Sequence, residues 1–163
     1  SNMDLKQLKI LLADDDTDDC LFFRETVEEI LPAENLSIVH DGEQLMQLIS
    51  GSNNKLPHVL FLDLNMPRKN GFECLSEIKA DLKLQYLTVI VFSTSFEHEV
   101  VNELYKNGAQ YFIRKPSEFL QFKTIIQQTL SRLSRELPTI ETQKIPQPLR
   151  ENFVLTIQNE VIV

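Results

Sequence analysis

The stretch that decides the fold is VLFLDLNMP, residues 59–67. Its first four residues are all apolar, as expected for a short strand that helices cover on both faces. Asp63 follows directly, and Pro67 prevents the chain from continuing as a regular strand. The pattern therefore predicts a buried strand that places a carboxylate at its own carboxyl end.

Four further apolar runs lie on either side of this one, separated by stretches with helical periodicity. The runs span residues 10–13, 36–39, 89–92 and 111–113, and the predicted helices span residues 18–30, 42–49, 71–82, 96–106 and 118–135. Strands that alternate with helices indicate a parallel sheet. We therefore predict an α/β fold with a five-stranded, doubly wound parallel sheet and helices on both faces.

Length and composition restrict the class of protein. The chain has 163 residues, 42% of them apolar, which suits one compact domain with an appendage. Its formal charge of -8 argues against nucleic acid as the main partner. No window approaches the roughly 18 apolar residues of a membrane span. Cys20 and Cys74 lie far apart, in no disulfide or metal-binding pattern, so we expect a cytoplasmic protein.

The character of the chain changes after Glu136. Three of the seven prolines fall within the polar stretch that follows, which forbids a continuous helix there. We expect a domain over residues 8–136 and a linker with an apolar arm over residues 137–163. Residues 152–163 read equally well as a disordered terminus or as a strand or small hairpin. A strand would add to an edge of its own sheet or of a partner's, which leaves a homodimer open.

Polar residues follow four of the predicted strands. Ligands of an open parallel sheet bind beyond the carboxyl ends of its strands. Asp14 and Asp15 follow the first strand, Asp63 the third, Ser93 the fourth and Lys115 the fifth. Taken singly, each has an ordinary explanation as a helix cap, a strand-end hydroxyl or a surface lysine. Together they predict one polar site at this edge of the sheet.

The chemistry of these residue types points to a cation and a phosphoryl group. Capping explains Asp16, Asp18 and Asp19, but Asp14 and Asp15 lie at the strand end, where uncompensated negative charge is costly. Mg²⁺ is often held by one or two carboxylates plus a phosphate, which suits this pattern better than Zn²⁺ or Ca²⁺. A carboxylate beside Mg²⁺ can act as a nucleophile towards phosphorus.

In order and spacing, these residues resemble the receiver domain of two-component response regulators. The resemblance covers about residues 9–135 and is carried by ILLADD at 10–15, LDLNMP at 62–67 with Gly71, FST at 92–94, NGA at 107–109 and KP at 115–116. It implies a flavodoxin-like sheet with strand order 2-1-3-4-5.

The resemblance also implies the roles of the site residues. Asp63 would accept a phosphoryl group from the phosphohistidine of a sensor histidine kinase or histidine phosphotransfer protein. Asp14, Asp15, Asp63 and the backbone carbonyl of Asn65 would bind Mg²⁺, with Mn²⁺ as an alternative. Lys115 would contact the phosphate, and its peptide bond to the following proline would be cis.

Two residues would report phosphorylation. The hydroxyl of Ser93 would be drawn to the phosphate, and Phe112 would turn inward. Phe112 departs from the tyrosine common in the family, so a phenol hydrogen bond is lost. Because the residues after Glu136 are too few for a DNA-binding or enzymatic module, we expect output through contact with an unknown downstream protein. The stand-alone format is most similar to regulators that serve phytochrome-type or other sensor kinases.

Two other readings compete with this one. Haloacid-dehalogenase-type phosphatases also use a strand-end aspartate with Mg²⁺, but their first motif requires threonine or valine where Asp18 stands. In that reading Asp14, rather than Asp63, would carry the phosphate. The other alternative is an unphosphorylated scaffold with a receiver fold, and such scaffolds typically lose one of Asp63, Lys115 and Ser93. We therefore expect a self-phosphorylating signalling domain rather than an enzyme in the usual sense.

Overall fold

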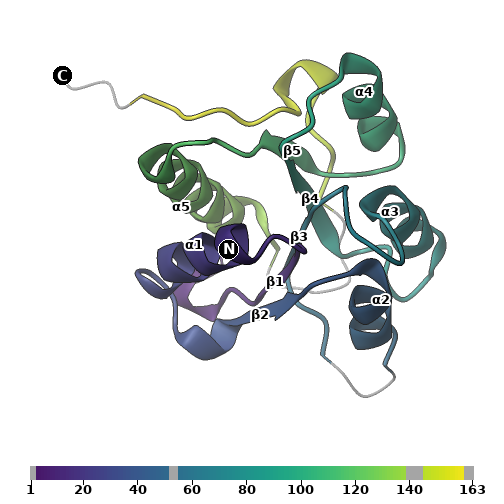
Figure 1. The fold of residues 1–163 in the computed structure, drawn as a ribbon, viewed down its shortest axis with the longest axis horizontal. Helices are drawn as coiled ribbons and strands as arrows, with labels where there is room; N and C mark the ends of the chain where they lie inside the picture. Colours follow the sequence, from purple (N-terminus) through teal and green to yellow (C-terminus); the bar gives the residue numbers. More distant parts are fainter. Residues whose placement is uncertain (1–2, 52–54, 139–144, 160–163) are drawn as a thin grey trace.

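The fold is that of a computed structural model, which describes residues 3–51, 55–138 and 145–159. Its centre is a five-stranded parallel sheet with the order β2-β1-β3-β4-β5 (Figure 1). The strands are β1 (Ile10–Ala13), β2 (Leu36–Val39), β3 (Val59–Leu62), β4 (Thr88–Ser93) and β5 (Tyr111–Arg114). The predicted α/β class and the strand order are confirmed.

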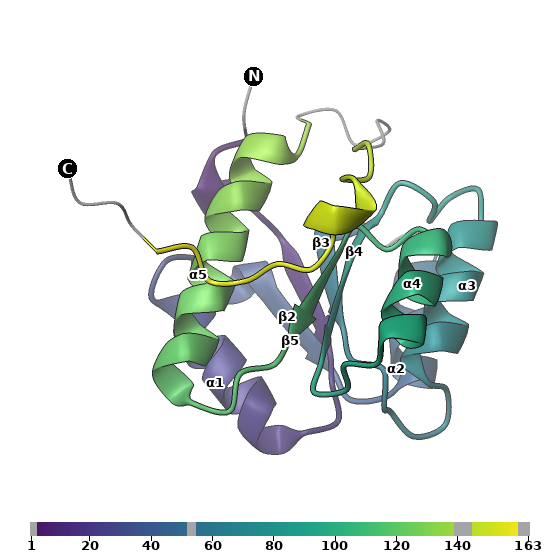
Figure 2. The ribbon, with the colours of Figure 1, turned by 90° about the horizontal axis from the view of Figure 1, so that it is seen from above.

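Helices cover both faces of the sheet. The five α-helices of the described chain are α1 (Thr17–Glu28), α2 (Gly42–Ser50), α3 (Gly71–Ala80), α4 (His98–Lys106) and α5 (Phe119–Glu136). Figure 2 shows α1 and α5 on one side of the sheet and α2, α3 and α4 on the other. This doubly wound arrangement leaves the carboxyl ends of the strands open at one edge, where the sequence predicts the site.

The core consists of one apolar cluster on each face of the sheet. Every residue of β1, β3 and β4 is buried, as the near-continuous apolar runs predicted. On the α1 and α5 side, Phe61 packs edge-to-face against Phe23 and Phe92, with ring centroids 5.0 Å and 6.3 Å away. Such aromatic pairs add stability beyond the area that they bury. The strands that carry the site are therefore held rigidly from both faces.

One departure from the predicted helices lies before α4 and bears on the site. Its helix begins at His98 rather than at residue 96, and the N-cap Glu97 makes no side-chain cap hydrogen bond. Phe96 therefore belongs to the loop after β4, where its ring lies 5.8 Å from that of Phe112. At the other end of α4, Gly108 has a φ of 95°, which confirms the predicted left-handed residue there.

The C-terminal segment pairs with the sheet at a single point. Phe112 of β5 and Val154 form an isolated parallel bridge, and no regular strand or hairpin is present within the described residues 145–159. The segment crosses the edge of the sheet and continues over α5, so it meets β5 only where it passes (Figure 2). The predicted addition to the edge of its own sheet thus occurs, but over one residue. Residues 160–163 of the predicted arm lie outside the described residues.

Two further expectations bear on the class of protein. No helix of the described chain is long and apolar enough to cross a membrane. Cys20 and Cys74 are both free and buried, and burial raises the pKa of their thiols to about 12 and about 11 respectively. Because the thiolate is the reactive form, neither cysteine is suited to nucleophilic or redox chemistry.

Candidate functional site

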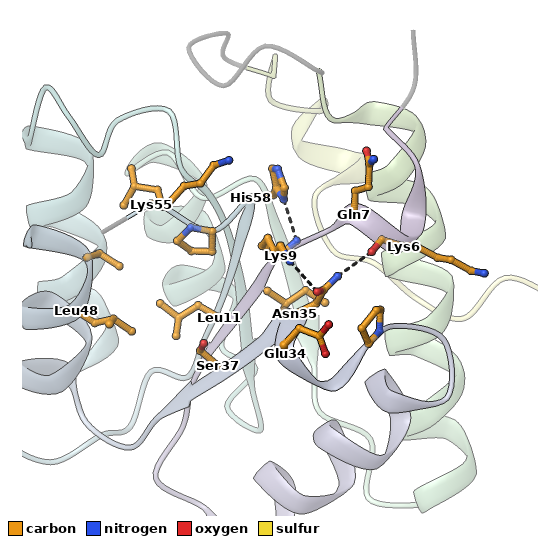
Figure 3. Close-up of a pocket in the computed structure, with 15 residues that line it drawn as sticks. Lys6, Gln7, Lys9, Leu11, Glu34, Asn35, Ser37, Leu48, Lys55 and His58 are labelled. Atoms are coloured by element: carbon orange, nitrogen blue, oxygen red, sulfur yellow. Dashed lines mark hydrogen bonds between the residues drawn. The ribbon is translucent and has the colours of Figure 1, made fainter. Parts of the chain in front are cut away.

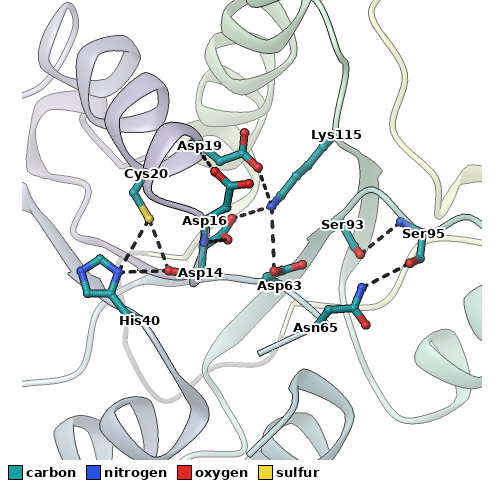
Figure 4. A network of polar contacts seen from close by, with 10 residues as sticks. All are labelled: Asp14, Asp16, Asp19, Cys20, His40, Asp63, Asn65, Ser93, Ser95 and Lys115. Atoms are coloured by element: carbon teal, nitrogen blue, oxygen red, sulfur yellow. Dashed lines mark hydrogen bonds and ion pairs between the residues drawn. The ribbon is translucent and has the colours of Figure 1, made fainter. Parts of the chain in front are cut away.

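The predicted site residues converge at the carboxyl edge of the sheet. Asp14 follows β1, Asp63 follows β3, Ser93 ends β4 and Lys115 follows β5. Figure 4 shows their side chains around one space, with the lysine reaching towards the carboxylates. All four residues are buried, so the cluster is part of the core edge and not a solvated surface.

Lys115 is the cation of the cluster. Its Nζ lies 2.6 Å from Asp14 Oδ2, 2.9 Å from Asp19 Oδ2 and 3.9 Å from Asp63 Oδ2. The ammonium group also lies 5.6 Å from the centroid of the Phe92 ring, within the range of a cation–π contact. In this structure Lys115 therefore pairs mainly with the first two carboxylates and only loosely with Asp63.

Asp19 is the site residue that the sequence reasoning missed, because it was assigned to helix capping. The cap of α1 is Asp16, whose Oδ1 accepts a hydrogen bond from the Asp19 backbone at 3.0 Å. This cap orients the first turn so that the Asp19 carboxylate accepts from Lys115. The available signal was its position in the first turn of a helix that starts at the carboxyl edge of the sheet.

Three carboxylates form a group suited to a metal ion. One oxygen from each of Asp14, Asp15 and Asp63 lies within 4.8 Å of the other two. Asp14 Oδ2 is buried, and within the described chain its close contact with Lys115 is an ion pair without hydrogen-bond alignment. Oxygen ligands and an underused buried carboxylate fit a hard divalent cation such as Mg²⁺ or Mn²⁺.

Burial disfavours the ionised forms of the carboxyl groups in the cluster. It raises the pKa of Asp63 to about 7, even though Lys115 and the Asn65 backbone act in the opposite direction. Burial also raises the pKa of Asp14. For Lys115, burial acts to lower the pKa, but the charge of Asp14 and its neighbouring carboxylates outweighs it, so the pKa is raised. One ammonium group therefore does not fully offset the buried carboxylates, and additional positive charge would stabilise their ionised forms.

A close backbone approach holds Asp63 in place. A Cβ atom on Gly71 would lie 2.3 Å from the Asp63 carbonyl oxygen, which is too close for any other residue. The Gly71 N–H donates to the Leu64 carbonyl at 3.0 Å, so the start of α3 is bonded to the loop that carries Asp63. The glycine that the sequence places at the head of this helix therefore positions the carboxylate.

Ser93 and Asn65 lie at the site without contacting Lys115 through their side chains, as far as the described residues go. The Oγ of the fully buried Ser93 accepts a hydrogen bond from the Ser95 backbone at 3.3 Å. Asn65 Nδ2 donates to Ser95 Oγ at 3.3 Å. The Lys115 backbone N–H donates to the Ser93 carbonyl at 2.9 Å, so β4 and β5 remain paired up to the site.

The structure corrects one expectation about β5 and adds detail to another. The bond between Lys115 and Pro116 was expected to be cis, but every peptide bond of the described chain is trans, the isomer that X-Pro bonds intrinsically favour. Phe112 is already fully buried, with its ring against Phe96. The aromatic side chain therefore points inward in this structure.

The opposite end of the sheet holds a cavity of about 770 Å³ (Figure 3). Within its lining, Lys9 Nζ donates to Asn35 Oδ1 at 2.8 Å, and the Lys9 backbone donates to His58 Nδ1 at 2.9 Å. The cavity thus lies at the amino ends of β1 and β3, away from the convergent carboxylates, and three of its polar residues are hydrogen-bonded.

Comparison with known proteins agrees with this geometry. The family model "Response regulator receiver domain" matches residues 10–127. The chain belongs to the response regulator receiver domain family. Response regulator Rcp1 of Synechocystis sp. is 30% identical over 110 residues, which are 65% of this chain and 75% of that protein.

Two solved structures show the same receiver fold. The phosphorylated cyanobacterial phytochrome response regulator RcpA is 28% identical with a TM-score of 0.75, covering 81% of this chain and 99% of that one. The Mn²⁺-bound form of response regulator Rcp1 is 27% identical with a TM-score of 0.71, covering 85% and 99%. The protein is thus a receiver-domain response regulator of a two-component system, and the family match favours this reading over the phosphatase alternative.

Proposed function

We propose that this receiver accepts a phosphoryl group on Asp63 from the phosphohistidine of a sensor histidine kinase or histidine phosphotransfer protein. The observation that carries the proposal is the burial of Asp63 beside Asp14, Asp15 and Lys115 at one edge of the sheet. A carboxylate in this setting is a nucleophile with one cationic group, Lys115, close to the oxygens of the phosphoryl group whose phosphorus it would attack.

The transfer assigns a task to each side chain. An Asp63 oxygen attacks phosphorus, the bond from phosphorus to the histidine nitrogen breaks, and the histidine leaves with that electron pair. Lys115 moves from Asp14 and Asp19 towards the new phosphoryl group, and the Ser93 hydroxyl donates to one of its oxygens. Mg²⁺, or Mn²⁺ in its place, held by Asp14, Asp15, Asp63 and the Asn65 carbonyl, would offset the negative charge of carboxylate and phosphate.

We propose Ser93 and Phe112 as the residues that transmit the change. Lys115 and Ser93 are joined by a backbone hydrogen bond, so movement of both towards a phosphoryl group also shifts the ends of β4 and β5. Phe112 lies three residues before Lys115 and contacts Phe96 in the loop after β4. Because Phe112 is already inward, the shift reaches the surface through the backbone of β5 and that loop.

Exposed apolar side chains on α1 and α5 suit an incoming partner. Leu21 of α1 is 52% exposed and Leu120 of α5 is 70% exposed. Phe119 is also exposed and its ring packs 5.1 Å from that of Phe22. We propose that a helical surface of a cytoplasmic kinase or phosphotransfer protein docks here, and the phytochrome response regulators among the similar structures favour a phytochrome-type kinase.

Intact-protein mass spectrometry tests the proposal. The wild type and Asp63→Asn are incubated with acetyl phosphate, with Mg²⁺ or with a chelator. We expect one phosphoryl adduct, on the wild type alone and only with Mg²⁺. An adduct on Asp63→Asn would favour another acceptor such as Asp14. A wild type that takes up neither acetyl phosphate nor beryllofluoride would favour the unphosphorylated scaffold.

A further inference from the structure

Residues 145–158, which we call the C-terminal strap, lie across the face formed by α4, β5 and α5 (Figure 2). The strap occupies the outer edge of β5. The Phe112 N–H donates to the Phe153 carbonyl at 3.0 Å, and the Leu155 N–H donates to the Phe112 carbonyl at 2.9 Å. Both outward backbone groups of Phe112 are therefore used by the strap, and no other strand can pair there while it is docked.

Phe153 anchors the strap. It is fully buried, with its ring 5.1 Å from that of Tyr105 on α4. The Arg150 guanidinium lies 5.8 Å from the centroid of the Phe153 ring, and its Nε donates to Asn102 of α4 at 2.7 Å. An aromatic side chain in a desolvated pocket, surrounded by polar contacts, is the usual anatomy of a binding hot spot.

The remaining contacts hold the backbone of the strap. Tyr105 Oη donates to the Pro148 carbonyl at 2.6 Å, and Gln110 Nε2 donates to the Pro146 carbonyl at 2.9 Å. On α5, Gln128 exchanges two hydrogen bonds of 2.8 Å with the backbone of Gln158. Most of these hydrogen bonds are made to the backbone of the strap, so they do not depend on its side chains. The face therefore suits any extended segment with one aromatic anchor, and a partner segment of this kind would take the place of the strap.

The strap and the phosphoacceptor site share β5. Phe112, which bonds the strap, lies three residues before Lys115, which bonds Asp14 and Asp19. The strap is thus docked on an arrangement of β5 in which Lys115 Nζ lies 2.6 Å from Asp14 Oδ2 and 3.9 Å from Asp63 Oδ2. A phosphoryl group that drew both Lys115 and Ser93 towards Asp63 would shift the ends of β4 and β5, which a backbone hydrogen bond joins, and so would change the strand to which the strap is bonded.

We propose that strap docking and phosphorylation of Asp63 oppose each other through β5, so that phosphorylation releases the strap and exposes the α4, β5 and α5 face to an extended partner segment with an aromatic anchor. This inference rests on the proposed function of Asp63. By linkage, the opposition is reciprocal: loss of the strap strengthens binding at the phosphoacceptor site by the same factor.

Amide hydrogen exchange on the full chain tests release directly. The Leu155 amide reports docking because it donates to β5. With Mg²⁺ and beryllofluoride as the phosphoryl mimic, we expect its exchange to accelerate by about 5-fold or more, while the Leu12 amide in β1 stays protected. Unchanged or slower exchange at Leu155 in protein shown by mass to hold beryllofluoride would overturn the strap proposal alone. Failure to bind beryllofluoride and acetyl phosphate would instead count against the proposed function.

Affinity for beryllofluoride tests the reciprocal effect. We expect Phe153→Ala to bind it about 5-fold or more tightly than the wild type. The matched control is Leu149→Ala, in the same segment but 66% exposed, which should bind as the wild type does. Should Phe153→Ala fail to fold, Gln147→Ala removes two hydrogen bonds between strap and domain instead. Equal or weaker binding by the folded variant, or a dimer in light scattering that Phe153→Ala dissociates, would overturn a strap docked within one chain.

Discussion

The two ends of the sheet differ in how their charges are satisfied. At the amino end, a cavity of about 770 Å³ is lined by Lys9, Asn35 and His58, whose polar groups bond one another. At the carboxyl end, Asp14 and Asp63 are buried around the single ammonium group of Lys115. The difference teaches that the site follows from unbalanced buried charge and not from the amount of open space.

The two ends of the sheet differ most clearly in the partners of Lys9 and Lys115. Each donates to an oxygen at less than 3 Å, but Lys9 meets a neutral amide whereas Lys115 meets ionised carboxylates. Removing one partner of a buried ion pair leaves an uncompensated charge, which is far more costly than losing one neutral partner. Replacing each lysine in turn therefore separates the two ends of the molecule.

Stability should show the largest effect. In chelator, we expect Lys115→Met to lower the free energy of unfolding by about 3–5 kcal/mol, because three carboxylates lose their cation. Mg²⁺ should restore much of this loss and bind more tightly than to the wild type, since the ammonium no longer competes for Asp14. Lys9→Met should lose about 1 kcal/mol, with no response to Mg²⁺. Urea titrations with and without Mg²⁺ measure both; equal losses would erase the distinction between the two ends.

Phosphorylation should separate the same two variants. Lys115→Met should slow phosphorylation by acetyl phosphate by about 100-fold, because a preorganised cation no longer stabilises the phosphoryl oxygens. Lys9→Met should react at the wild-type rate. Time courses by intact mass give both rates. A slow Lys9→Met would mean that the amino end contributes to the chemistry.

The dependence of stability on pH sharpens the account of Asp63. Its folded-state pKa of about 7 lies above the ordinary value of 3.8, so the folded state binds its proton more tightly. In chelator, this group's contribution to the free energy of unfolding should fall as pH rises from about 4 to 7, by on the order of 4 kcal/mol. Asp63→Asn should lack that fall and be the more stable protein at pH 8. Parallel denaturation curves for the two proteins with the same slope would contradict this.

The smallest effect is expected at the mouth of the site. Asn65, two residues after Asp63, is exposed and donates to Ser95 Oγ at 3.3 Å, which ties the loops after β3 and β4 together. Removing this hydrogen bond in Asn65→Ala should admit water and speed loss of the phosphoryl group by roughly 2- to 10-fold. Decay of the phosphorylated mass after removal of acetyl phosphate measures the rate. Slower decay would mean that Asn65 itself assists the attacking water.

The site residues at the ends of the apolar strands were predictable from sequence. Apolar runs that end in Asp14, Asp63 and Ser93 predict both the sheet and the edge at which these side chains meet, because parallel strands align their carboxyl ends. Asp19 was not predictable, because a first-turn aspartate looks the same whether it caps a helix or pairs with a distant lysine. Its partner, Lys115, lies 96 residues away, and only the packing of α1 against the sheet brings the two together.

The C-terminal segment shows the same limit of prediction from sequence. Its apolar composition predicted a need for a partner, and the structure supplies β5 and the pocket beside Tyr105. The sequence left a disordered terminus, a strand and a hairpin open, and within the described residues the segment pairs with β5 through one parallel bridge between Phe112 and Val154. Composition indicates that such a segment packs against the domain, but which residue becomes buried, here Phe153, and where the segment meets the sheet depend on tertiary contacts.

The most direct test of the central claim, that Asp63 is the phosphoacceptor, is chemical trapping. The wild type is phosphorylated with acetyl phosphate and Mg²⁺, then reduced with borohydride, which converts an aspartyl phosphate to homoserine. We predict that tandem mass spectrometry of the peptide spanning β3 and α3 will place homoserine at position 63 and nowhere else in the chain. Homoserine at position 14 or 15, with Asp63 unchanged, would contradict the account.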